Sequence, residues 1–155
     1  MRALFVTILL VALVLPIGHA PASPPSDISA ADLQTLRNLA AQGNSTAQYN
    51  FGVLYDFRIG VPQDFATARE WYQKAAAKGH AGAQNNLGGL YEFGRGVTRN
   101  DVLAYMWYSL AAAHSADDEW RDLAAENRDD IAGHMTSAQI ANAKKRAREW
   151  KPIQK

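Results

Sequence analysis

The sequence predicts an all-α fold, a short solenoid of stacked helical hairpins between helical caps. One stretch of the chain occurs twice, because Gly43–Ala75 and Gly79–Ala111 align without a gap at a spacing of 36 residues. Each copy holds two helical apolar stripes with a glycine-containing loop between them. Self-similarity at such a period is typical of stacked helical repeats. At least ten aligned pairs are identical: Gly43/Gly79, Ala47/Ala83, Gln48/Gln84, Gly52/Gly88, Tyr55/Tyr91, Gly60/Gly96, Val61/Val97, Ala68/Ala104, Trp71/Trp107 and Tyr72/Tyr108.

Residues 1–22 are predicted to be a secretory signal peptide. Arg2 precedes the apolar run Leu4–Leu15, which is too short for a stable membrane anchor. The motif Ala20-Pro21-Ala22 is an A-x-A site that predicts cleavage after Ala22. The expected product is periplasmic or secreted, with a flexible Pro/Ser-rich leader at 23–27 and no integral membrane span.

The composition of the expected mature chain excludes several function classes. Its 133 residues (155 minus 22) fit one domain and hold 15 basic and 15 acidic residues. This neutral balance argues against a nucleic-acid binder, which usually has a strongly basic surface. The chain contains no cysteine, so disulfides, thiolate metal sites and cysteine redox chemistry are excluded.

Residues 28–43 are predicted to form an N-terminal capping helix. Ser29 with Asp32 three residues later resembles a helix start, Leu33, Leu36 and Leu39 follow at helical spacing, and Gly43 ends the helix.

Two hairpins follow, one repeat at 44–78 and the other at 79–114. Their loops carry Gly60 and Gly96, and Asp64 and Asn100 are suited to cap the second helices. Gly52 and Gly88 lie within the first helices, where glycine is unfavourable unless a neighbouring helix needs the space. We expect the indoles of Trp71 and Trp107 to fill that space.

Residues 115–151 are predicted to form a C-terminal helical cap. Thr136 and Gln139 form a T-x-x-Q capping box, and Pro152 ends the last helix. Asp117–Asp130 has a net charge of −5, whereas Lys144–Lys155 has a net charge of +5. Either the two helices pack antiparallel and neutralise each other, or the basic face makes weak contact with anionic envelope material. Four residues would make that contact: Lys144, Lys145, Arg146 and Arg148.

The repeated motif resembles Sel1-like repeats, relatives of the tetratricopeptide repeat. Each copy reads A-x-x-x-F/L-G-x-x-Y, then G-V, then A-x-x-W-Y-x-x-A, and Arg128–Trp150 is similar to the helical cap of exported bacterial members. The resemblance implies a right-handed α/α superhelix that binds proteins. One departure is Arg58, which stands where repeat two has Gly94.

The recurring aromatic residues are interpreted as core, so a binding surface is expected where the repeats differ. The first helices differ along two i, i+4, i+7 stripes opposite the predicted core, and in tetratricopeptide-like stacks this stripe lines the concave groove. An ordinary solvated face is the alternative. Seven residues are predicted to contact a protein or peptide partner: Thr46, Tyr49, Val53, Asp56, Asn85, Gly89 and Glu92.

No catalytic motif is present, since the sequence contains no G-x-S-x-G, S-x-x-K or H-E-x-x-H. His80, His114 and His134 lie in separate units, without the spacing of a metal site. The sequence therefore predicts an adaptor without catalytic residues, metal or cofactor. Two alternatives stay open. One is an envelope enzyme or enzyme subunit acting on peptidoglycan or β-lactams, although the chain lacks the cysteines of family members linked to β-lactams. The other is a structural envelope protein attached through its basic C-terminal helix.

Overall fold

The computed structural model describes residues 28–153. The predicted signal peptide, its cleavage site and the leader at 23–27 lie outside the described residues. Within them the chain forms seven helices and no strand, which confirms the all-α prediction. They are α2 (Ala30–Ala41), α3 (Ser45–Phe57), α4 (Phe65–Ala76), α5 (Ala81–Phe93), α6 (Asp101–His114), α7 (Asp118–Ala132) and α8 (Ser137–Glu149).

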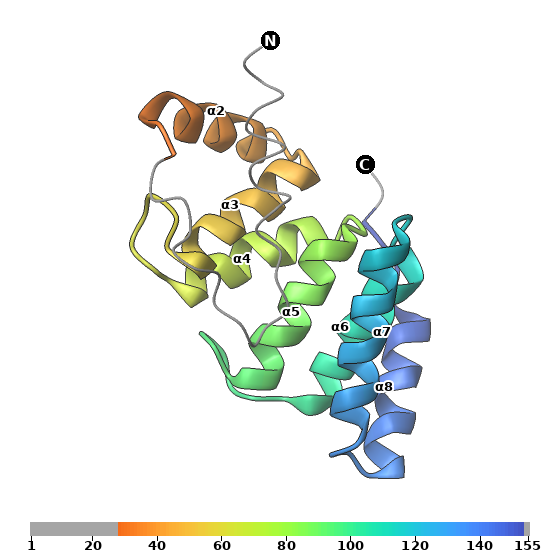
Figure 1. Cartoon of the computed structure of the whole chain (residues 1–155). Coiled ribbons are helices and arrows are strands. Elements are labelled where there is room, and N and C mark those ends of the chain that lie inside the picture. The colour runs from red at the N-terminus through yellow and green to blue at the C-terminus, as the bar shows by residue number, and fades with distance from the viewer. Residues whose placement is uncertain (1–27, 154–155) are drawn as a thin grey trace.

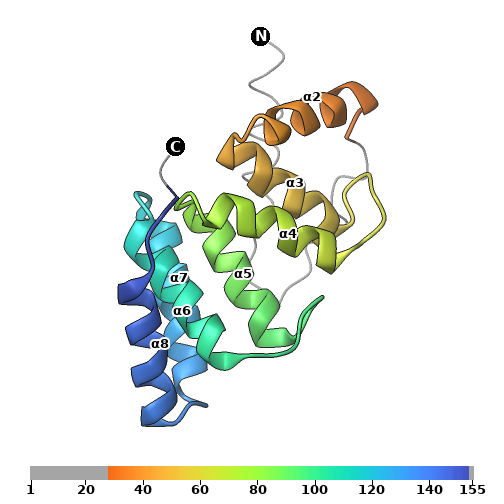
Figure 2. The same ribbon diagram turned by 180° about the vertical axis from the view of Figure 1, so that it is seen from behind.

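From α2 to α7 each helix packs against the next, so the chain forms a stack of hairpins (Figure 1). Helices α3 and α4 form the first hairpin and α5 and α6 the second, while α2 covers one end of the stack. Helix α6 packs against α7 and α8 as well as α5. Helices α7 and α8 close the other end of the stack, as the view from behind also shows (Figure 2).

The helix starts follow the predicted capping residues. Side chains of Ser29, Asp64 and Asn100 accept hydrogen bonds from backbone amides in the first turns of α2, α4 and α6. Thr136 and Gln139 form the complete predicted capping box of α8. These local signals are confirmed because capping depends on a few neighbouring residues and not on the packing of the stack.

The mid-helix glycines make room for tyrosines, so the prediction that tryptophan indoles fill this space is wrong. A Cβ on Gly52 would lie 2.6 Å from the ring of Tyr72. A Cβ on Gly88 would lie 2.5 Å from the ring of Tyr108. Trp71 instead meets the ring of Phe51 edge-on, with 4.9 Å between the ring centroids.

Repeat-invariant glutamines join each hairpin to the helix before it. The Gln48 side-chain amide donates to the Ala40 carbonyl at the end of α2, at 3.1 Å. The Gln84 amide donates to the Ala76 carbonyl at the end of α4, at 3.2 Å. The same carbonyls also accept from the backbone amides of Gly43 and Gly79, so each buried glutamine adds a second donor at the end of a helix and fixes the turn between units.

The core consists of two clusters that meet in the second hairpin. One cluster runs from Leu36 in α2 to Leu90 in α5. The other joins Tyr105 of α6 to Ile131 of α7 and Ala143 of α8. Helix α6 therefore attaches the C-terminal cap to the repeats.

Candidate functional site

A groove opens where the N-terminal ends of α3 and α5 meet the turn between α6 and α7. Its volume is about 370 Å³. The residues lining it come from three parts of the chain that are far apart in sequence: Thr46, Tyr49 and Asn50; His80, Ala81 and Gly82; and His114, Ser115, Ala116, Asp117 and Trp120. The stacking of the hairpins thus creates the groove, and no one repeat contains it.

Aromatic rings form one wall of the groove. The ring of Tyr49 stacks on the ring of His80, with centroids 4.6 Å apart and an interplanar angle of 21°. Both rings pass beside Gly82, where an added Cβ would lie only 3.2 Å from Tyr49 and 3.3 Å from His80. Gly82 therefore lets the two helices approach closely enough for the rings to stack.

His80 caps α5 and is held in its neutral form. Its Nδ1 accepts a hydrogen bond from the Ala83 amide at 3.2 Å, so the ring proton is on Nε2. Burial lowers the pKa of His80 to about 4, because the charged imidazolium would lose its hydration. At neutral pH the groove wall is therefore uncharged at this residue.

The opposite wall is formed by the turn from α6 to α7. Nδ1 of His114 lies 3.0 Å from Oε1 of Gln84, and this contact ties the end of α6 to α5. Asp117 caps α7 by accepting from the Trp120 amide at 3.1 Å. About two turns further along α7, the Asn127 amide donates to Oδ1 of Asn85 at 3.0 Å, which fixes α7 against α5.

Two of the seven predicted contact residues, Thr46 and Tyr49, line this groove. The two stripes were expected to lie opposite the core, and for most of their residues this is wrong. Val53 is only 1% exposed, and Asp56, Asn85 and Gly89 are buried as well. The reason is that α3 is covered by α2 and α4, and α5 by α4, α6 and α7. Helices covered on several sides leave no continuous solvated stripe.

Asp56 and Glu92 bind tyrosines that lie across their own hairpins. The Tyr72 hydroxyl donates to Asp56 at 3.0 Å and accepts from the Asn86 amide at 3.0 Å. Burial raises the pKa of Asp56 to about 6, although the hydrogen bond from Tyr72 opposes this rise. The Tyr108 hydroxyl donates to Glu92 at 2.6 Å. Each carboxyl group is thus hydrogen-bonded from one helix of its repeat to the other.

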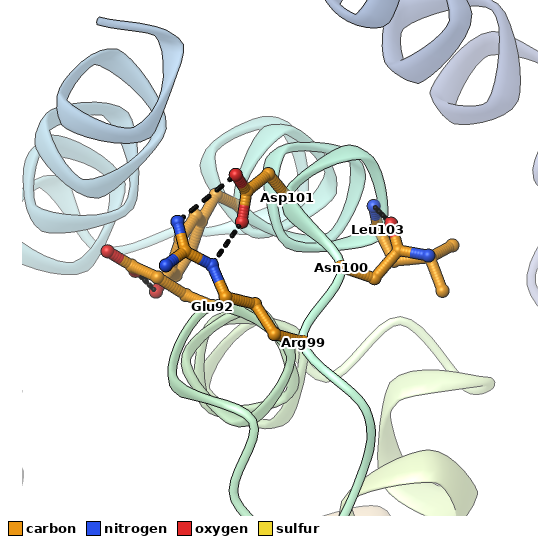
Figure 3. Close-up of polar contacts among 6 residues, drawn as sticks. Glu92, Arg99, Asn100, Asp101 and Leu103 are labelled. Atoms are coloured by element: carbon orange, nitrogen blue, oxygen red, sulfur yellow. Dashed lines mark hydrogen bonds and ion pairs between the residues drawn. The ribbon is translucent and has the colours of Figure 1, made fainter. Parts of the chain in front are cut away.

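Glu92 is only half-buried, and it lies at the loop end of the second hairpin, away from the groove (Figure 3). Beside it, Arg99 forms a two-pronged ion pair with Asp101, with N–O distances of 2.9 and 3.2 Å. Asn100 accepts from the Leu103 amide at 3.0 Å and so starts α6. These contacts are local to the loop and the start of α6, whereas Glu92 itself is held by the Tyr108 hydroxyl.

The described residues, 28–153, contain no group of three or more histidine, aspartate or glutamate side chains placed to hold a metal ion. None of the helices in this part of the chain is both long and apolar enough to cross a membrane.

Sequence reasoning missed the residues of the groove that come from the turns between units. His80 could have been found, because it aligns with Asn44 in the other repeat, and Asn44 likewise caps its helix by accepting from the Ala47 amide. Trp120 gave no such signal, since it lies beyond the repeats in a segment without a matching copy.

The family model for the Sel1 repeat matches residues 45–80 and 81–115. Among curated protein sequences, none matches this chain significantly. Two solved structures are similar. One is c5321, a protective antigen present in uropathogenic Escherichia coli strains that displays an SLR fold, with 30% identity and a TM-score of 0.71 over 77% of this chain. The other is a Sel1 repeat protein from Oxalobacter formigenes, with 31% identity and a TM-score of 0.59 over 78% of this chain.

The chain spans a quarter of the length of the first of these proteins and half of the second. Both matched repeats coincide with the two hairpins, α3 with α4 and α5 with α6. The predicted resemblance is confirmed, and the two hairpins of this chain are Sel1 repeats.

Proposed function

We propose that this chain is an exported adaptor that holds a peptide or protein segment in the groove between Thr46 and Trp120. Sel1 repeats generally serve as scaffolds for protein–protein interaction and are typically not enzymes. The proposal of export rests on the predicted signal peptide at 1–22. No catalysis, cofactor or nucleic acid is part of the proposed role.

The groove itself is the observation that carries the proposal. Its volume of about 370 Å³ is in the range of specific binding pockets and has room for side chains of a bound peptide. The stacked rings of Tyr49 and His80 offer a flat apolar wall, and aromatic walls supply much of the binding energy at protein interfaces.

Backbone groups in the groove suit a peptide as well. The capping side chains of Asn44 and His80 accept hydrogen bonds from the backbone amides of Ala47 and Ala83. Earlier amides in the first turns, such as those of Thr46 and Gly82, have no intrahelical partner. They can donate to carbonyl or carboxylate oxygens of a peptide, because unpaired amides at a helix start attract such groups.

The walls of the groove are rigid, which favours binding. Tyr49 is 6% exposed, His114 is tied to Gln84, and Asn127 is tied to Asn85. A receptor that is already ordered loses little conformational entropy when a partner binds. The partner therefore bears most of the ordering cost.

The test is a crosslinking pull-down from the envelope fraction of the source cells, with Thr46→Arg as the groove variant. Thr46 is exposed, so an arginine there obstructs the groove without disturbing the core. Gln73→Arg is the matched control, because Gln73 is also exposed on a helix but lies outside the groove. Circular dichroism checks that both variants keep their helices.

We expect a specific partner that the wild type and Gln73→Arg capture equally and that Thr46→Arg loses. A partner captured equally by all three proteins would place the binding surface elsewhere. If no partner is captured, a turnover assay of the purified protein on peptidoglycan and β-lactams tests the envelope-enzyme alternative, and turnover would contradict the adaptor role.

A further inference from the structure

The outer faces of α7 and α8 carry stripes of opposite charge. Along α7, four exposed acids recur at intervals of four residues, which places them on one face of the helix: Asp118, Asp122, Glu126 and Asp130. Along α8 and just beyond it, exposed bases are spaced i, i+4 and i+7 at Lys144, Arg148 and Lys151. Lys145 and Arg146 are exposed beside them.

In the described residues no ion pair joins the two stripes, so the mutual neutralisation that was one of the two expectations is not seen. Helices α7 and α8 both pack chiefly on α6. In the described residues every ion pair involving them stays within one helix, as in Arg128–Asp129 and Lys145–Glu149. Helix α7 faces the viewer in Figure 1, whereas α8 faces the viewer when the molecule is seen from behind in Figure 2.

The charge pattern of α7 is unfavourable for an isolated chain. Like charges four residues apart on a helix repel each other. Asp129 and Asp130 also lie in the last turn, where the helix dipole disfavours negative charge. A surface of positive charge placed along α7 would relieve both effects.

We propose that the basic face of α8 docks on the acidic face of α7 in a second copy of this chain. The two stripes have opposite charge, and in the described residues no ion pair joins one to the other. Because they lie on different sides of α6, one copy presents its α8 in one direction and its α7 in another. Such a contact is head-to-tail, and repetition extends the assembly instead of closing a symmetric dimer.

The contact is weak and sensitive to salt. Its charges are exposed, and ions screen exposed charges beyond about 10 Å at 0.1 M ionic strength. Assembly is therefore favoured where the protein is concentrated and the salt is low. The groove reaches the start of α7, but the residues reversed below do not line it, so the two proposals can fail independently.

The test is sedimentation velocity on protein purified from cells that express the full chain. At about 20 mM salt we expect the weight-average mass to rise with concentration to at least about twice the monomer mass, and at about 500 mM salt to stay near the monomer. Monomer at every salt and concentration overturns the proposal.

Two charge-reversed variants locate the contact. The first is Lys144→Glu with Arg148→Glu and Lys151→Glu. The second is Asp122→Lys with Glu126→Lys, at residues for which no side-chain hydrogen bond is lost. Each variant alone should remain monomeric at low salt, and an equimolar mixture should assemble, because the reversed faces attract each other. Circular dichroism confirms that each is folded.

Three outcomes overturn the proposal. Assembly that survives either reversal places the contact elsewhere, and a mixture that stays monomeric shows that the two faces do not meet. Binding to vesicles that contain anionic lipid, by a wild type that remains monomeric, assigns the basic face to envelope material instead. Vesicles of neutral lipid are the control for that arm.

Discussion

At the scale of single residues, His80 combines two roles, as cap of α5 and as wall of the groove. Its counterpart Asn44 performs only the first, because Asn44 does not line the groove. The exchange of one N-cap residue for another thus produces an aromatic wall in repeat two while the helix start stays intact.

The variant His80→Asn should reduce the loss of stability in acid. A free histidine has a pKa near 6.5, whereas that of His80 is about 4 in the folded protein. Between these two pH values the unfolded chain binds a proton that the folded protein does not bind. The stability contributed by neutral His80 is therefore present above pH 6.5 and is lost as the pH falls towards 4. Asparagine keeps the cap for the Ala83 amide and does not titrate.

Urea denaturation at several pH values between 4 and 7 measures this difference. Asp56 contributes with the opposite sign, because its raised pKa of about 6 means that stability falls as the pH rises from about 4 to 6. That contribution is present in both proteins and cancels in the comparison. Identical pH dependence of the wild type and the variant would show that His80 is not held neutral.

The variant Gly88→Ala should destabilise the protein by about 3 kcal/mol, because overpacking a close contact forces the surrounding helices apart. The new Cβ would lie 2.5 Å from the Tyr108 ring, which is 1% exposed and anchored by its hydroxyl to Glu92. On helix propensity alone, alanine would gain about 1 kcal/mol. A thermal denaturation midpoint at or above that of the wild type would mean that the ring moves aside freely.

At the scale of elements, equivalent loops close the two hairpins in the same way with different residues. Arg58 ends α3 in the left-handed conformation, with φ of 58°, and Gly94 ends α5 with φ of 64°. The sequence showed this departure from the repeat, and the structure shows that the loop keeps its path. Arginine therefore bears a conformational cost that glycine avoids.

Exchanging these two residues should shift stability in opposite directions. Arg58→Gly should stabilise the protein by about 1 kcal/mol, and Gly94→Arg should destabilise it by a similar amount. The space around Gly94 is open enough to accept a Cβ, with the nearest atoms at 3.5 Å, so the backbone angle alone causes the loss. Urea denaturation of both variants checks the pair, and a loss of stability in Arg58→Gly would show that the arginine side chain makes a compensating contact.

At the scale of the whole molecule, each unit of the stack depends on its neighbours. Helices α4, α5 and α6 have packed partners on both sides, whereas α2 packs chiefly on α3. In repeat proteins, stability is approximately the sum of units and of the interfaces between neighbours. Terminal units therefore open with a smaller free energy than central ones.

Native-state hydrogen exchange should show this gradient. Amides of α2 should exchange fastest among the helices, and those of α4 and α5 slowest, because opening the centre breaks two interfaces. Mass spectrometry of peptides from Ala30–Ala41 and Ala81–Phe93 provides the comparison. Equal protection of both would indicate that the stack unfolds as one cooperative unit.

The sequence by itself determined the all-α fold, the two hairpins and several helix starts, because these depend on local spacing. The repeat of 36 residues, the glycines within helices and the capping residues at Ser29, Asp64, Asn100 and Thr136 are all visible without a structure. Their physical causes act within a turn or two of the chain.

The tertiary structure alone decided which surfaces are open. It buried Val53 and Asn85, placed tyrosines instead of tryptophans against the glycines, and brought Thr46, His80 and Trp120 to one groove. It also left the charged stripes of α7 and α8 without an ion pair between them, which the sequence could not decide. The reason is that exposure depends on every helix that packs around a residue, and spacing along one helix specifies only the residues that share a face.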